Sequence, residues 1–212
     1  MLFLLFGSSG SGKTTVRDAL RGRDPSLAVH DADEVYADRH WSELSRHEAN
    51  EIWLRRAVEY QDSGVDLLLA AQTPFGELLA APSASLIDGI SACLLDCPDD
   101  IRVERLTERG AEWLARTPGT MKDYVQWGAW MRRHARDPRW MPHVIRGGDE
   151  SGTAMRWGRW SAWDASDPRW RVEVIDSGSL HVTEVCAAVL AWIERERYLW
   201  STGVHPLHGW TP

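Results

Sequence analysis

Residues 7–14 read Gly7-Ser8-Ser9-Gly10-Ser11-Gly12-Lys13-Thr14 and match the pattern G-x-x-x-x-G-K-[ST]. An unbroken apolar run from Leu2 to Phe6 precedes this stretch, as is typical of a fully buried parallel strand. The residues from Thr15 to Arg21 suit a helix that Gly22 ends. A strand, a glycine-rich turn and a helix direct backbone N–H groups and a helix N-terminus toward a phosphate. The sequence therefore predicts a phosphate-binding loop and not a flexible linker.

Two side chains of this loop have predicted roles. Lys13 is expected to reach the outer phosphates of a nucleotide, and the Thr14 hydroxyl is expected to ligate Mg²⁺. The nucleotide-binding residues predicted for the whole segment are Gly7, Ser8, Ser9, Gly10, Ser11, Gly12, Lys13, Thr14 and Thr15.

Length and composition limit the other possibilities. The chain has 212 residues and a net charge of −7, which suits a single domain over residues 1–212 and counts against a broad nucleic-acid-binding face. Its three cysteines form no C-x-x-C pair and are expected to be reduced and mostly buried. No basic leader precedes the first strand and no apolar run reaches membrane-spanning length, so a cytoplasmic protein without membrane contact is expected. Monomer and homodimer both stay open.

A second buried strand, predicted over residues 26–30, ends in Asp31-Ala32-Asp33. In open α/β sheets the ligand crevice lies beyond the carboxyl ends of the strands. The two carboxylates are two positions apart, so on an extended tip they point the same way and are candidates for chemistry. The alternative is an acidic turn that leads into a helix N-terminus, where carboxylates are favoured anyway.

The third strand, predicted over 65–71, ends at Gln72-Thr73 without an aspartate. The carboxylate that supports a metal must therefore come from elsewhere, and Asp31 is the obvious candidate. Gln72 can still hydrogen-bond a metal-bound water or a substrate hydroxyl. Asp96 closes the fourth strand, predicted over 90–96, either as a metal ligand or as a cap of the next helix.

Three further helices and a last strand complete the pattern. The helix predicted over 101–109 carries Arg105 and Arg109 one turn apart on one face, and arginine suits both stacking on a base and binding phosphate oxygens. Helices are also predicted over 43–61 and 182–197, and the fifth strand over 170–175. Strands alternating with helices predict a parallel α/β sheet. In the tail, His205 and His208 are interpreted as surface residues.

Residues 110–168 form a long insertion before the last strand, and they are rich in tryptophan and arginine. The chain has 13 tryptophans, most of them in its central third. Packing of a small subdomain explains them, but aromatic faces also stack on sugars and bases. A helix is predicted over 121–136, and its candidate substrate contacts are Trp127, Trp130 and Arg133. Trp157 and Trp160 are further candidates for a pocket wall.

Four motifs give the chain a resemblance to a known family. They are Gly7–Thr14, Asp31-Ala-Asp33, Arg105-x-x-x-Arg109 and Asp176-Ser177-Gly178 after the last strand. With them the chain resembles the small P-loop kinases of the nucleoside-monophosphate-kinase-like group, which includes shikimate, gluconate and chloramphenicol kinases and polynucleotide 5′-hydroxyl kinases. The resemblance implies a three-layer P-loop fold, a five-stranded parallel sheet of order 2-3-1-4-5, and a helical lid at residues 110–168.

The resemblance also implies roles for single residues, with ATP and Mg²⁺ as cofactors. Asp31 would support the metal and Asp33 would accept the proton of the attacking hydroxyl, or the two roles would be reversed. Arg105 would lie on the adenine face and Arg109 on the transferring phosphate. Asp176, Ser177 and Gly178 would edge the adenine.

The predicted function is ATP-dependent phosphate transfer to a hydroxyl of a small molecule such as a sugar, a nucleoside or a natural product. Positioned phosphates, charge neutralisation and an oriented hydroxyl are what this reaction needs. A nucleic-acid 5′-hydroxyl kinase is the second possibility, and the acidic net charge counts against it. The third is a nucleotide-dependent switch or adaptor, for which two neighbouring carboxylates would serve no purpose.

Overall fold

The computed structural model describes residues 1–37, 43–116, 119–146 and 153–207. A five-stranded sheet forms the centre, and the order of its strands is β2-β3-β1-β4-β5. All four strand pairs are parallel, which confirms the predicted sheet. The strands are β1 (Leu2–Phe6), β2 (Leu27–Asp31), β3 (Asp66–Ala71), β4 (Ile90–Asp96) and β5 (Val172–Asp176).

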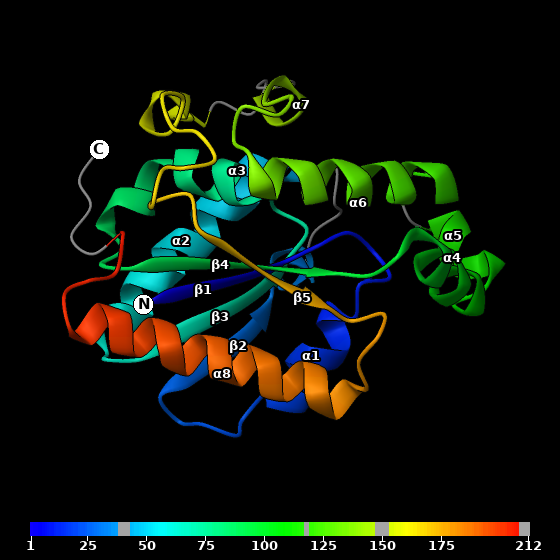
Figure 1. Cartoon of the computed structure of the whole chain (residues 1–212), viewed down its shortest axis with the longest axis horizontal. Helices are drawn as coiled ribbons and strands as arrows, with labels where there is room; N and C mark the ends of the chain where they lie inside the picture. The colour runs from blue at the N-terminus through cyan, green and yellow to red at the C-terminus, as the bar shows by residue number, and fades with distance from the viewer. Residues whose placement is uncertain (38–42, 117–118, 147–152, 208–212) are drawn as a thin grey trace.

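Helices cover both faces of this sheet (Figure 1). One face carries α1 (Lys13–Leu20) and α8 (Val182–Ser201), which pack on an apolar cluster that includes Phe3, Leu5 and Trp192. The other face carries α2 (Arg46–Asp62), α3 (Phe75–Ala80) and α6 (Met121–Arg136). The central strands β1 and β4 are buried along their whole length, because each face of the sheet is covered.

Shorter elements connect these layers. They are the 3₁₀ turns η1 (Ala32–Tyr36), η3 (Pro82–Leu86) and η4 (Trp157–Arg159), and the helices α4 (Asp99–Glu108), α5 (Ala111–Arg116) and α7 (His143–Arg146). The break between α3 and η3 falls at Pro82, which lacks the N–H that would continue the helix.

The tryptophan-rich segment packs mainly as part of the core. Trp160, Trp163 and Trp170 are buried in the same apolar cluster as the residues of α2 and α3. Trp160 also donates a hydrogen bond of 2.7 Å from its indole N–H to the Gly76 carbonyl. A Cβ at Gly76 would lie 2.8 Å from the Trp160 ring, so this glycine makes room for the tryptophan. The packing explanation therefore holds for these tryptophans, whereas opening and closing of residues 110–168 as a lid stays a prediction.

Other features of the sequence can be checked against the structure. The three cysteines are buried and free, as expected. Among the described residues, no helix combines the length and the apolar character that crossing a membrane demands.

Candidate active site

The phosphate-binding loop joins β1 to α1 at the carboxyl edge of the sheet. Gly10 and Gly12 have φ angles of 82° and 92°, in the left-handed region that glycine adopts without strain. Gly7 allows a close approach, because a Cβ there would lie 2.3 Å from the Leu95 carbonyl oxygen. Three of the glycines in the motif are thus required by the backbone path.

Lys13 reaches back over this loop. Its Nζ donates hydrogen bonds to the carbonyls of Gly7 at 2.8 Å and Ser8 at 3.1 Å. Burial lowers the pKa of Lys13 to about 8, against the opposing effect of Asp31 and Asp33. The ammonium group is therefore positively charged at neutral pH and lies where the outer phosphates of a nucleotide are expected.

A cavity of about 1240 Å³ opens in front of the loop. Lys13 and Thr14 of the loop line it, together with Asp31 at the end of β2 and Asp33 in η1. Its remaining polar and aromatic wall comes mainly from η1, α2, the end of β3 and α6. That wall includes Tyr36, Arg46, Asn50, Gln72, Thr73, Arg109, Trp113, Tyr124 and Trp127.

Asp31 is engaged on both carboxylate oxygens. Oδ2 pairs with the Arg17 guanidinium of α1 at 2.9 Å, and Oδ1 accepts the backbone N–H of Asp33 at 3.0 Å. Asp31 with Glu34 forms a capping box that begins η1. The expectation that Asp31 and Asp33 lie on one extended tip is therefore wrong, because this cap turns the chain at Ala32.

Asp33 differs from Asp31 in having an available carboxylate. Within the described part of the chain, no hydrogen bond or ion pair engages its side chain, although it faces the same cavity as Lys13 and Thr14. Shielding by the cavity wall and repulsion from Asp31 raise the pKa of Asp33, against the attraction of Lys13 and Arg17. A carboxylate with a raised pKa is better suited to accept a proton than an ordinary surface aspartate.

The donor set around Thr14 fits a magnesium ion. Mg²⁺ prefers hard oxygen ligands and usually keeps several waters. The Thr14 hydroxyl and the carboxylates of Asp31 and Asp33 supply such oxygens along one cavity. In the described ranges no three acidic, histidine or cysteine side chains form a closed cage, so water and phosphate oxygens would complete the coordination. Because Arg17 already pairs with Asp31, the structure leaves open which aspartate supports the metal.

A second cavity, of about 370 Å³, lies on the other side of the loop, where the nucleotide base is expected. Thr15, Arg105, Arg109 and Ser177 contribute to its wall, and Arg109 also lines the large cavity. Arg109 thus stands where the two cavities adjoin, as a residue at the transferring phosphate would. Its guanidinium carbon lies 5.0 Å from the centre of the Trp113 ring.

The guanidinium of Arg105 makes hydrogen bonds to backbone carbonyls of two loops. It donates to the Gly10 carbonyl at 3.2 Å and to the Ser177 carbonyl at 2.7 Å, so it ties the phosphate loop to the loop after β5. Asp176 accepts the Gly178 N–H at 2.7 Å and shapes that loop. Of the three residues predicted to edge the adenine, Ser177 lines the cavity, whereas Asp176 and Gly178 build the turn beside it.

Asp96 holds a buried ion-pair network. It accepts Arg102 at 2.7 Å and Arg132 of α6 at 2.5 Å. Arg102 is fully buried and donates a second bond of 2.7 Å to the carbonyl of Ser9 in the phosphate loop. Asp96 thus stabilises the loop from behind through its arginines. The metal and helix-cap interpretations of Asp96 are both replaced by this network.

Sequence reasoning missed Arg102, although one signal was available. Gly128 lies inside α6, where glycine is unfavourable. A Cβ at Gly128 would lie 2.9 Å from the Arg102 guanidinium. A glycine in the middle of an otherwise regular helix indicates that something large approaches it.

Helix α6 also contacts the phosphate loop directly and contributes an aromatic wall. The Ser8 hydroxyl donates to the Tyr124 carbonyl at 2.8 Å. Trp127 lines the large cavity, as predicted for a substrate contact. Trp130 lies behind it with the two rings stacked at 4.8 Å and 3°, and is only 8% exposed. Arg133 stacks on Trp140, 4.9 Å from the ring centre. Trp130 supports Trp127 from behind, and neither Trp130 nor Arg133 lines the cavity, contrary to their prediction as substrate contacts.

A polar cluster that sequence reasoning also missed lies behind the part of the cavity wall that Arg46, Asn50 and Thr73 form. Glu77 is fully buried and accepts Arg46 at 2.7 Å and the Asn50 amide at 2.9 Å. Asn50 in turn accepts the Thr73 hydroxyl at 2.7 Å. Gln72, the predicted contact, lines the cavity and is exposed. These residues come from α2, α3 and the end of β3, which no short motif joins.

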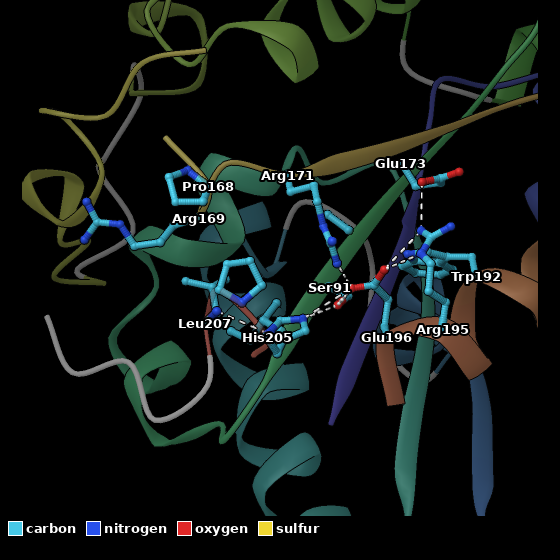
Figure 2. A pocket seen from close by; sticks show the side chains of 13 residues that line it. Ser91, Pro168, Arg169, Arg171, Glu173, Trp192, Arg195, Glu196, His205 and Leu207 are labelled. Atoms are coloured by element: carbon cyan, nitrogen blue, oxygen red, sulfur yellow. Dashed lines mark hydrogen bonds and ion pairs between the residues drawn. The ribbon is translucent and has the colours of Figure 1, made fainter. Parts of the chain in front are cut away.

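A third, very small cavity lies at the opposite edge of the sheet, away from the phosphate loop. Figure 2 shows the side chains of Ser91, Glu196 and His205 pointing toward one another there. Ser91 lies 2.7 Å from His205 and donates to Glu196 at 3.2 Å. Burial opposes the ionisation of Glu196, but the His205 hydrogen bond and the charges of Arg171 and Arg195 lower its pKa to about 2.

This third cavity holds about 10 Å³, room for one water at most. Its ion pairs fix the C-terminal segment to the sheet. His205 is 6% exposed, so its interpretation as a surface residue was wrong, because Ser91 supplies a buried partner that the sequence does not reveal. His208 lies outside the described residues.

Solved structures of other proteins are similar to this chain in fold, whereas no similar sequence family is found. No protein-family model and no curated protein sequence matches the chain. A crystal structure from Chloroflexus aurantiacus J-10-fl, described as a "putative kinase", matches 92% of this chain and 96% of its own, at 15% identity and a TM-score of 0.50. The chain shares the fold of that protein, with a phosphate-loop motif after the first strand of a parallel sheet.

Two other solved structures are similar over most of their length. A gluconokinase from Sinorhizobium meliloti 1021 is 18% identical, with 91% of each chain covered and a TM-score of 0.49. A shikimate kinase from Acinetobacter baumannii is 12% identical, with 92% of this chain and 93% of its own covered and a TM-score of 0.47.

Proposed function

We propose that the chain is an ATP-dependent phosphotransferase that moves the γ-phosphate of ATP to a hydroxyl of a small molecule. One observation carries the proposal: the available carboxylate of Asp33 faces the same cavity as Lys13 and Thr14 of the phosphate loop. A loop that only binds a nucleotide has no need of a carboxylate with a raised pKa in the same cavity.

Each residue of the site has a proposed role in phosphate transfer. The loop backbone and Lys13 hold the phosphates and offset their charge. The oxygen of the acceptor hydroxyl bonds to the γ-phosphorus while Asp33 accepts the hydroxyl proton. The bond from the γ-phosphorus to the ADP oxygen breaks at the same time. Arg109, where the two cavities adjoin, stabilises the charge on the phosphate in transit. Mg²⁺ bound near Thr14 and one of the two aspartates would neutralise charge on the phosphates.

The acceptor is enclosed mainly by side chains of α2 and α6. The cavity, of about 1240 Å³, leaves room for a ring-sized acceptor beside the phosphates. Exclusion of water by this wall favours transfer to the acceptor over hydrolysis of ATP.

Phosphate transfer measured by mass across a panel of hydroxylated metabolites and antibiotics, with ATP and Mg²⁺, tests the proposal. We expect a product that gains one phosphate, with ADP formed in equal amount. Asp33→Asn should lower the rate by roughly 10²- to 10⁴-fold, because general base catalysis is lost. Asp62→Asn, an exposed carboxylate at the end of α2, is the matched control. Full activity in Asp33→Asn would show that Asp33 is not the base.

A further inference from the structure

The direction of the Asp33 side chain depends on the backbone that carries it. Within the described part of the chain no hydrogen bond or ion pair holds this carboxylate, so no neighbouring side chain orients it. Asp33 lies in η1, a 3₁₀ turn of five residues, and such turns have poorer hydrogen-bond geometry than α-helices. A base that must meet a hydroxyl within hydrogen-bond reach therefore needs this turn to be held from outside.

Glu34 is the side chain that closes the start of this turn. Its Oε1 accepts the backbone N–H of Asp31 at 3.2 Å and completes the capping box. Asp31 Oδ1 accepts the Asp33 N–H at 3.0 Å at the same cap. Of the described residues, those that line the large cavity do not include Glu34. Its bonds thus fix the backbone around Asp33 without occupying the space in front of it.

Two further groups set the position of the Glu34 carboxylate itself. Arg21, directly after α1, donates from Nη2 to Oε1, and its Nε donates to the Val29 carbonyl of β2 at 3.2 Å. Because a carboxylate only accepts, Nδ1 of His30 donates to Oε2, at 2.6 Å, and His30 Nε2 lies 2.8 Å from the Tyr60 hydroxyl of α2. Such charge-assisted bonds are short and directional. Glu34 is thereby tied to α1, β2 and α2.

A tryptophan of α2 holds the backbone on the other side of Asp33. The indole N–H of Trp53 donates to the Ala32 carbonyl at 2.9 Å, and Trp53 is buried. The centre of its ring lies 5.2 Å from the centre of the His30 ring, so the two supports of the turn adjoin. The residue before Asp33 and the residue after it are both bound, whereas the Asp33 carboxylate stays available.

We propose that Glu34 is the residue that positions Asp33. Its bonds to α1, β2 and α2 fix η1, and the fixed turn directs the Asp33 carboxylate toward the acceptor hydroxyl. This inference rests on the proposed function, in which Asp33 is the base. Glu34 acts through Asp33 alone and touches neither nucleotide nor acceptor. A displacement of the base by about 1 Å is enough to lower the rate roughly 10²-fold.

Amide hydrogen exchange of the whole chain without ligand, measured by mass spectrometry, tests whether Glu34 orders the turn. In Glu34→Leu the amides of residues 31–36 should exchange about tenfold faster than in the wild type, as expected when hydrogen bonds that hold the turn are lost. Glu34→Gln keeps an oxygen that accepts the Asp31 N–H and should stay close to the wild type. Glu184→Leu is the matched control, because the exposed Glu184 closes the same kind of capping box at the start of α8. It should speed exchange there and not in η1.

Steady-state transfer to the acceptor identified in the panel tests whether the ordered turn serves the base. Glu34→Leu should lower kcat roughly 10- to 10²-fold and leave the KM for ATP unchanged, because the phosphate loop still holds the nucleotide. Glu34→Gln should recover most of the lost kcat. Arg21→Met removes one partner of Glu34 and should lower kcat by a smaller factor, which keeps the test decisive if Glu34→Leu does not fold. Glu184→Leu should keep the kcat of the wild type.

Each outcome bears on one of the two proposals. Unchanged exchange over residues 31–36 in Glu34→Leu overturns the positioning role, and so does faster exchange with an unchanged kcat. Equal losses of kcat in Glu34→Leu and Glu184→Leu would reflect a general loss of stability and overturn it as well. In all three cases transfer by the wild type leaves the proposed function standing. If the wild type transfers no phosphate, or Asp33→Asn transfers it at the full rate, the proposed function fails and the positioning role falls with it.

Discussion

The two ends of the large cavity are built in different ways. The end that faces the nucleotide consists of consecutive residues, Gly7 to Thr14, whose backbone conformation is set by glycines at defined positions. The end at which we propose that the acceptor binds, called the acceptor end here, consists of side chains from η1, α2, α6 and the end of β3, which only folding brings together. The first end can therefore be recognised from eight consecutive residues, whereas the second depends on side chains that lie far apart in the sequence.

The largest effect should come from the residue that links the two ends. Arg102→Met removes one partner of a fully buried ion pair and leaves Asp96 and the Ser9 carbonyl without its hydrogen bonds. We expect the free energy of unfolding to fall by about 3–5 kcal/mol. Urea denaturation measures it, with the exposed Arg136→Met of α6 as control. A change equal to that of the control would mean that the loop does not depend on this network.

Lys13→Met should separate the nucleotide end from the acceptor end. Transfer should fall roughly 10²- to 10³-fold, as when one preorganised donor to a developing charge is lost. Binding of the acceptor should be unchanged, because Lys13 belongs to the phosphate loop, whereas side chains of α2 and α6 are proposed to enclose the acceptor. Steady-state kinetics and calorimetry measure the two quantities. Equal losses of transfer and of acceptor binding would show that the two ends are not independent.

The pH profile of kcat/KM should have an acidic limb set by Asp33 and an alkaline limb set by Lys13. Asp33 must be ionised to accept a proton, and its raised pKa moves the acidic limb above the pH of an ordinary aspartate. Lys13 must be charged, and its pKa of about 8 produces a decline above that pH. Each limb should approach about tenfold per pH unit. In Asp33→Asn the acidic limb should vanish and the alkaline limb should stay; an unchanged acidic limb would assign it to another group.

The smallest effect concerns the support behind the acceptor wall. Burial lowers the pKa of His134 to about 4 from 6.5, so the unfolded chain binds a proton at pH values where the folded chain does not. Stability should therefore be lost as the pH falls from 6.5 toward 4, with a slope of at most about 1.4 kcal/mol per pH unit from this residue. Urea midpoints of the wild type and of His134→Phe between these pH values measure it. Parallel pH dependences in both proteins would contradict the assignment.

The sequence was sufficient for the sheet and for the nucleotide end. Mainly apolar runs, each followed by a turn, predicted the first four strands, because buried parallel strands need nearly continuous apolar residues. The fifth strand was predicted from Val172, Val174 and Ile175, between which a charged residue stands, and it is the edge strand β5. The glycine-rich loop was predicted from local geometry alone. The roles of Lys13, Asp33 and Arg109 stay predictions, and their positions along one cavity are compatible with them.

The acceptor end could not be predicted, for a physical reason. Arg46 lies 31 positions from Glu77 in the sequence, and their ion pair exists only once α2 and α3 pack together. Trp127 and Trp130 were both candidates, because helical spacing shows which side chains share a face but not which of them reaches the cavity. Asp31 was expected on an extended tip, and its side chain instead caps the turn that follows.

The close fit between Gly128 and the Arg102 guanidinium limits how this protein can be re-engineered. A foreign helix exchanged for α6, chosen for a different acceptor wall, would have to bring a glycine at this position. Any other residue would press on an arginine that holds the phosphate loop. The part of the cavity wall that α6 contributes therefore cannot be exchanged on its own, and grafts that alter it must keep the close contact at Gly128.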